Sequence, residues 1–221
     1  MKIRHWFNIL VFTILGSLLI PAQADTDSDY QDALTLYRQG QLRESLTALD
    51  RILQSNPEFV AAYYSRCVVN YDLGALRDAL NDCTQAQMRA PDHSQAWYMR
   101  GLIRSQNFGD NQGSLADFSR AIDIDPDYGA AYLKRGNARN RLGDLAGSIE
   151  DYSQAIRIDQ NDADAFFNRG VALFNSGDVA QAKSDLKRAE ALYQRQGNDE
   201  GKERASNALT IIHQSNHSST P

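Results

Sequence analysis

Apolar and polar residues alternate along most of the chain with the three- and four-residue spacing of amphipathic helices. Between residues 144 and 159, this spacing puts small and apolar side chains on one helical face: Ser148, Ile149, Tyr152, Ala155 and Ile156. Residues 129–142 form a similar helix, and the step Gly143-Asp144 ends it and caps the next one. The pattern therefore predicts a helical hairpin over this part of the chain.

The hairpin pattern recurs with a period close to 34 residues. Small residues form one column, with spacings of 34, 34, 35 and 34: Ala33, Cys67, Gly101, Gly136 and Gly170. Aromatic residues form a second column: Tyr63, Trp97, Tyr132 and Phe166. One hairpin of this length is too small to bury its own core, so the repeats are expected to stack on one another.

This pattern resembles the tetratricopeptide repeat (TPR) family, whose signature runs from an aromatic residue through a glycine and an alanine to a proline. One unit follows the signature with serine where alanine is usual: Trp97, Gly101, Ser114, Phe118 and Pro126. The resemblance implies an all-α fold, a right-handed α-solenoid of five TPR helical hairpins within residues 25–196. The expected repeats are 26–59, 60–93, 94–128, 129–162 and 163–196.

The segment after the repeats is predicted to close the stack. A C-terminal capping helix is expected within residues 197–214, and residues 215–221 are expected to be a disordered tail. One side of the helix would pack on the stack: Ala205, Ala208, Leu209 and Ile212. The other side would stay in solvent: Lys202, Glu203, Arg204 and Asn207.

Residues 1–24 are predicted to be a secretory signal peptide. A basic start leads into an apolar run over residues 9–20, and Ala22-Gln23-Ala24 follows with the spacing of a cleavage site. The run has about 12 residues, whereas a membrane-spanning helix needs about 20. We therefore predict cleavage after Ala24, no membrane span afterwards, and export to the periplasm, with the thylakoid lumen or secretion as alternatives. A segment kept as an anchor is the alternative to cleavage.

Charge and composition narrow the function classes. The chain has 23 Lys+Arg against 28 Asp+Glu, a net charge of −5, which argues against a nucleic-acid partner because such proteins carry basic patches. Two cysteines are too few for a four-cysteine zinc site. The sequence has no nucleophile elbow, phosphate-binding loop or His-Glu-x-x-His motif, so we predict no enzyme activity, no cofactor and no metal.

The two cysteines, Cys67 and Cys83, belong to one repeat and lie 16 residues apart. Cys67 takes the small-residue position of the first helix, and Cys83 stands where Phe118 and Tyr152 stand in later repeats. Both are therefore expected to face the interior of the hairpin. An oxidising compartment would favour a disulfide between them, whereas two buried free thiols are the alternative, and the sequence leaves both open.

A recurring pair of charges departs from the family signature. Arginine replaces the usual leucine before the small residue in four repeats: Arg66, Arg100, Arg135 and Arg169. The second helices of the same repeats carry aspartate: Asp82, Asp117, Asp151 and Asp185. A catalytic site would occur once rather than four times, so we predict a ladder of ion pairs or charge-assisted hydrogen bonds between helices.

TPR proteins line a concave groove with the first helices of their repeats and bind extended peptides or partner segments there, which implies candidate groove residues in this chain. The aromatic candidates, whose alternative role is packing between repeats, are Tyr64, Tyr71, Tyr98 and Phe167. The polar candidates are Lys134, Asn137, Asn140, Arg141, Asn168 and Asn175. Asparagine can pair with a peptide backbone, and Lys134 with Arg141 could hold a carboxylate.

The resemblance therefore implies a non-enzymatic interaction scaffold or adaptor that binds a protein or peptide partner in this groove. By analogy with the family, the process would be assembly of envelope or membrane complexes. The alternative is a chaperone-like or inhibitory regulator of an exported enzyme.

Overall fold

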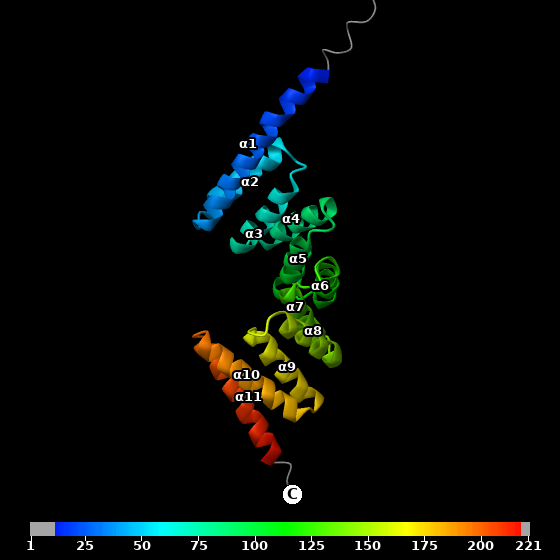
Figure 1. Cartoon of the computed structure of the whole chain (residues 1–221), viewed down its shortest axis with the longest axis vertical. Helices are drawn as coiled ribbons and strands as arrows, with labels where there is room; N and C mark the ends of the chain where they lie inside the picture. The colour runs from blue at the N-terminus through cyan, green and yellow to red at the C-terminus, as the bar shows by residue number, and fades with distance from the viewer. Residues whose placement is uncertain (1–11, 218–221) are drawn as a thin grey trace, which may run out of the picture. The chain divides into compact units, whose positions relative to one another are not determined.

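The computed structural model describes residues 12–217, and every regular element within that range is an α-helix (Figure 1). In chain order the helices are α1 (Phe12–Arg38), α2 (Leu42–Ser55), α3 (Val60–Asp72), α4 (Leu76–Arg89), α5 (Ser94–Asn107), α6 (Asn111–Ile124), α7 (Gly129–Arg141), α8 (Leu145–Ile158), α9 (Ala163–Ser176), α10 (Val179–Arg195) and α11 (Asp199–His217). None of the described helices has both the length and the apolar character needed to cross a membrane. The predicted cleavage point after Ala24 falls within α1, and the first part of the predicted signal peptide lies outside the described residues.

The helices pack in successive pairs as the hairpins α1–α2, α3–α4, α5–α6, α7–α8 and α9–α10. A glycine in the left-handed backbone region follows the first helix of each hairpin, and in the last hairpin Gly177 has φ of 93°. Asp178 then caps α10, because its side chain accepts a hydrogen bond from the backbone N–H of Gln181 at 3.0 Å. The glycine tolerates the turn and the aspartate satisfies an N–H of the new helix, so the two residues together reverse the chain.

The chain divides into two compact units, residues 1–91 and residues 92–221. The first unit holds α1 to α4 around one apolar core: Ala33, Leu49, Ile52, Leu53, Ala62 and Val69. The second unit holds α5 to α11, and its cores join neighbouring hairpins, as where Leu133 and Tyr152 pack with Ala165 and Ala172 of α9. The predicted all-α fold of stacked hairpins is confirmed.

Helix α11 follows the last hairpin and packs mainly on α10 (Figure 1). Ala205 and Ile212 are buried, as predicted for the packing side of the capping helix. Gly201 allows a close approach, because a Cβ at this position would come within 2.5 Å of the Tyr193 ring. The helix continues to His217, so residues 215–217 belong to it rather than to the predicted tail, since no glycine or proline interrupts the chain there.

The two helices of a hairpin meet closely at the column of small residues. In the third and fourth repeats, a Cβ at Gly101 would come within 2.8 Å of Phe118, and a Cβ at Gly136 within 2.6 Å of Tyr152. Both rings are buried and fill the space that the glycines leave.

The second repeat fills the same place with a disulfide. Cys67 and Cys83 occupy the positions of the glycine and the ring, and both are fully buried. Their sulfur atoms are bonded and their Cα atoms are 5.3 Å apart. Of the two alternatives left open by the sequence, the structure therefore contains the disulfide and not two free thiols. Helix axes usually lie about 8–10 Å apart, whereas a disulfide needs Cα atoms within about 7 Å. The two small side chains permit this approach because no ring separates the helices here.

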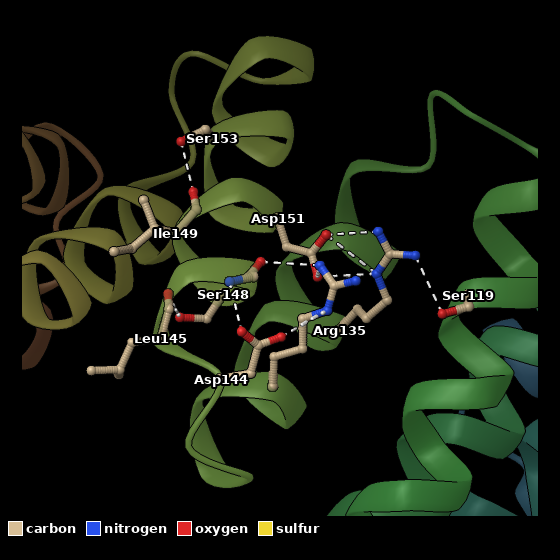
Figure 2. Close-up of polar contacts among 10 residues, drawn as sticks. Ser119, Arg135, Asp144, Leu145, Ser148, Ile149, Asp151 and Ser153 are labelled. Atoms are coloured by element: carbon tan, nitrogen blue, oxygen red, sulfur yellow. Dashed lines mark hydrogen bonds and ion pairs between the residues drawn. The ribbon is translucent and has the colours of Figure 1, made fainter. Parts of the chain in front are cut away.

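The predicted pairing of arginine with aspartate is present in all four repeats. In the fourth repeat (Figure 2), Arg135 of α7 donates from Nε and Nη2 to the buried carboxylate of Asp151 in α8, at 3.0 and 2.7 Å. Its Nη1 reaches the hydroxyl of Ser119 in α6 at 3.3 Å (Figure 2). Arg139, one turn along α7, lies 3.0 Å from the same carboxylate. Arg135 therefore connects three helices from two successive hairpins.

Each arginine of this ladder also lies over the aromatic residue three positions before it. The pairs, with the guanidinium carbon 4.9–5.8 Å from the ring centroid, are Arg66–Tyr63, Arg100–Trp97, Arg135–Tyr132 and Arg169–Phe166. Burial opposes the charge of Arg66, but its hydrogen bonds to Asp82 and Asp50 outweigh this effect and raise its pKa. The arginine and aromatic columns are thus one structural element, a largely buried ion pair stacked on a ring.

Candidate partner-binding site

A cavity of about 370 Å³ opens in the second unit among α7, α8, α9 and α11. The first helices of the fourth and fifth repeats supply most of its wall, with five residues from α7 and four from α9. The lining residues are Leu133, Lys134, Asn137, Asn140, Arg141, Tyr152, Asp164, Phe167, Asn168, Val171 and Arg204.

Asn137 connects the walls of this cavity. Its Oδ1 accepts a hydrogen bond from the Tyr152 hydroxyl at 2.9 Å and another from Nδ2 of Asn168 at 3.1 Å. These bonds join α7 to α8 and α9. They involve neither the amide nitrogen of Asn137 nor the amide oxygen of Asn168, so one donor and one acceptor lie outside this network and within the cavity lining.

The Tyr152 hydroxyl is held in its neutral form. Burial raises its pKa well above the ordinary value; the charge of Arg141 lowers it in part, and Asp151 raises it. A neutral hydroxyl donates to the Asn137 oxygen, which fixes the orientation of that amide. The Asn137 nitrogen is thereby set as a donor on the other side of the amide.

The charges of the cavity lining are mostly positive. Lys134, Arg141 and Arg204 stand against one carboxylate, Asp164, an excess of two positive charges in a chain whose net charge is −5. The Arg204 guanidinium carbon lies 5.0 Å from the centroid of the Phe167 ring. An anionic ligand group would find several cationic donors at this one place.

Six of the ten predicted groove residues line this cavity: Lys134, Asn137, Asn140, Arg141, Phe167 and Asn168. Asn175, in the last turn of α9, is exposed and does not line it. The polar positions of the fourth repeat therefore gather at one place, because residues three and four apart share a helical face.

The four aromatic candidates do not gather in one cavity, and only Phe167 lines the one in the second unit. Tyr64 lines a different, mostly apolar cavity of about 240 Å³ in the first unit, and Tyr71 lines neither cavity. Tyr98 of α5 packs within its own repeat, with its ring centroid 5.8 Å from that of Phe118 in α6 and 5.0 Å from that of Tyr128, the residue just before α7. The Tyr98 ring is partly buried by these contacts and does not line the cavity of the second unit.

Three polar residues of the cavity are not among the predicted groove residues: Tyr152, Asp164 and Arg204. Arg204 was expected on the solvent side of the capping helix, and its side chain is indeed half exposed, but it reaches Phe167 and Asp164 of α9. No spacing in the sequence relates α11 to α9, so only the packing of the two helices reveals this contact. The leucine and valine that interrupt the polar pattern, Leu133 and Val171, also line the cavity.

This arrangement suits binding. Its amides can pair with a peptide backbone, its cations with a carboxylate, and the ring of Phe167 offers an apolar face. Among the described residues, no group of three His, Cys, Asp or Glu side chains is placed to hold a metal ion.

Family models match most of the repeat region. A model described as a tetratricopeptide repeat matches residues 30–87 and 71–128, and another with that description matches residues 164–194. A model described as a TPR repeat matches residues 136–177. Together the matches extend over more than half of the chain. No curated protein matches the sequence.

Several solved structures share the fold. MamA from Desulfovibrio magneticus RS-1 has a TM-score of 0.70 at 18% identity, over 77% of this chain and 96% of its own. YrrB, described as a TPR protein with an unusual peptide-binding site, has a TM-score of 0.69 at 19% identity, over 87% and 97%. PilW, described as a widely conserved type IV pilus biogenesis factor, has a TM-score of 0.66 at 17% identity, over 84% and 92%.

Proposed function

Because the chain belongs to the tetratricopeptide repeat family, we propose that it is a non-enzymatic protein that binds an extended peptide or protein segment. One observation carries the proposal: the cavity of the second unit collects asparagine amides and cations from the first helices of two successive repeats. Backbone groups of a peptide need both a donor and an acceptor, and Asn137 with Asn168 supplies both. Lys134 and Arg141 would pair with a carboxylate of the partner.

We further propose that the protein works after export and assists the assembly of envelope or membrane complexes. The basic and apolar start of the chain supports export. The buried Cys67–Cys83 disulfide supports an oxidising destination, because structural disulfides persist mainly outside the reducing cytosol. The envelope role rests on analogy with PilW, which is described as a pilus biogenesis factor. Determining the N-terminal residue of the protein isolated from its native host tests export, since cleavage after Ala24 would leave Asp25 first.

The binding proposal is tested by crosslinking in the native host, identification of the partner, and titration of the purified partner. The test variant reverses two charges of the cavity, Lys134→Glu and Arg141→Glu. The matched control reverses two exposed charges of the same unit that lie outside the cavity, Arg120→Glu and Lys187→Glu. Circular dichroism melting of each variant verifies that the fold is retained.

We expect the cavity variant to lose at least about tenfold in affinity, which is the scale of one charge-assisted hydrogen bond. The control variant should bind as the unchanged protein does. Equal affinity of all three proteins would overturn the proposal for this cavity. Recovery of a single enzyme at a one-to-one ratio would instead favour the alternative role as a regulator of an exported enzyme.

A further inference from the structure

Helix α11 belongs to no repeat, yet it supplies one wall of the cavity through Arg204. The start of this helix is fixed, because Asn198 Oδ1 accepts a hydrogen bond from the backbone N–H of Gly201 at 2.8 Å. Gly201 packs against the Tyr193 ring, and Ala205 is fully buried beside it. The backbone that carries Arg204 is therefore held from both sides.

The Arg204 side chain is positioned by an aromatic face and a weak ion pair. Its guanidinium carbon lies 5.0 Å from the Phe167 ring centroid, and its Nη2 lies 3.2 Å from the Tyr193 hydroxyl and 3.4 Å from Asp164 Oδ1. The same Asp164 oxygen accepts a short hydrogen bond from the Tyr193 hydroxyl. Asp164 is thus already paired with another donor.

This ion pair is looser than those of the ladder. The ladder pairs have N–O distances of 2.6–2.7 Å, and charge-assisted bonds of this kind usually measure about 2.7–2.9 Å. The Arg204–Asp164 pair measures 3.4 Å, with the two side chains 50% and 58% exposed. A loose and exposed pair contributes little, so Arg204 can exchange Asp164 for a better acceptor at small cost.

We infer that Arg204 is a specificity-determining residue, which makes the cavity select peptide segments that carry a carboxylate over neutral ones. This inference rests on the proposed function, because it names the chemical class of the segment bound there. A ligand carboxylate would accept hydrogen bonds from the in-plane N–H groups of Arg204, while Lys134 and Arg141 add to the positive charge of the cavity. Asp164 is the internal competitor that lowers the affinity for such a ligand.

Because Asp164 and the ligand carboxylate compete for Arg204, substitutions of Arg204 and of Asp164 should change the preference for acidic peptides in opposite directions. Arg204→Gln should remove most of the preference for acidic peptides. Asp164→Asn should increase that preference, because the change removes the competing charge and leaves an oxygen that can still accept from Tyr193. Arg204→Lys keeps the charge and should keep part of the preference. If the Arg204–Asp164 pair only stabilised the fold, substitutions of Arg204 and of Asp164 would not shift the peptide preference in opposite directions.

The experiment measures fluorescence anisotropy with three labelled heptapeptides. The first is amidated and alternates glutamate with alanine; the second has glutamine in place of glutamate; the third is the glutamine peptide with a free C-terminal carboxylate. The protein variants are Arg204→Gln, Arg204→Lys, Asp164→Asn and the control Arg120→Gln, an exposed position of α6 outside the cavity. Melting curves verify that each variant is folded.

We expect the unchanged protein to prefer the glutamate peptide over the glutamine peptide by about tenfold. Arg204→Gln should lose most of this preference and keep only what Lys134 and Arg141 contribute. The third peptide should bind more tightly than the glutamine peptide to the unchanged protein, because it also carries a carboxylate. An undiminished preference in Arg204→Gln, or a weaker preference in Asp164→Asn, would overturn the inference. Equal binding of all peptides by the unchanged protein would also overturn it but leave the proposed function intact, whereas no binding of any peptide would count against both.

Discussion

Reduction of the Cys67–Cys83 disulfide is the sharpest test of how the first unit is held together. The bond closes a loop with a sequence separation of 16 residues. A closed loop of this size lowers the entropy of the unfolded chain by an amount worth about 3 kcal/mol of stability. Small domains have only about 5–15 kcal/mol in total, so the first unit should lose a large part of its stability on reduction.

The expected change in melting temperature follows from this free energy. A domain of 60–100 residues shifts by about 4–8 °C for each kcal/mol, so reduction should lower the melting temperature of the first unit by roughly 12–24 °C. Both cysteines of the chain lie in the first unit, which makes the second unit an internal control. Hydrogen exchange read by mass spectrometry should therefore speed up in α3 and α4 and stay unchanged in α9 and α10.

A rescue variant separates the effect of the bond from that of the sulfur atoms. The double change Cys67→Gly and Cys83→Phe installs in the second repeat the pair found in the third, where Phe118 fills the space over Gly101. This variant should melt at the same temperature with and without reductant. The melting temperature of the control Cys67→Ala with Cys83→Ala should also be independent of reductant. It should be lower than that of the rescue variant, because two alanines leave the space between the helices unfilled.

Two results would refute this reasoning. Titration of the denatured, unreduced protein should find no free thiol, and two free thiols would show that the bond does not form. A melting curve of the unchanged protein that does not move on reduction would show that the bond forms without stabilising the unit.

Three further predictions concern other parts of the fold. Arg135→Ala leaves the buried Asp151 carboxylate without its main partner and should cost about 3 kcal/mol in chemical denaturation, whereas alanine at an exposed position costs less than about 0.5 kcal/mol. Gly136→Ala places a Cβ 2.6 Å from Tyr152 and should cost about 1–3 kcal/mol in the same assay; a neutral effect would mean that the ring can move aside. Tyr37 donates a hydrogen bond to the Asp72 carboxylate, which raises the pKa of Tyr37 from 10.0 to about 12. The stabilising effect of this hydrogen bond is therefore present below pH 10 and is lost as the pH rises toward 12. Stability of Tyr37→Phe measured across this range should fall less than that of the unchanged protein, and parallel curves would contradict the assignment.

Much of the fold could be predicted because its signals are local and repeated. The turn at Gly177-Asp178 is an example, since a left-handed glycine and a helix-capping aspartate act within four residues. The ladder pair of Arg135 with Asp151 was predicted because it recurs once per repeat, although its stacking on Tyr132 was not. Residues that recur at the same position of successive repeats tend to make the same contacts in each repeat.

The candidate site was predicted only in part. Lys134, Asn137 and Arg141 share one helical face, so their meeting in the cavity follows from helical geometry. Tyr98 illustrates the limit, because an aromatic residue on the same face of another repeat can either bind a partner or pack on neighbouring rings, as Tyr98 does on Tyr128. Which of the two happens depends on the neighbouring side chains rather than on the residue itself.

Spacings within one period of the amino-acid sequence are enough to predict the helices, their pairing into hairpins and the recurring ion pairs. Three other features follow from tertiary packing and could not be predicted from these spacings: the division into two units after residue 91, the approach of Cys67 to Cys83, and the contact of Arg204 with Phe167. The disulfide and the contact of Arg204 depend on how closely particular helices within one unit approach one another. That distance is set by the side chains between two helices jointly, and it leaves no periodic trace along the chain.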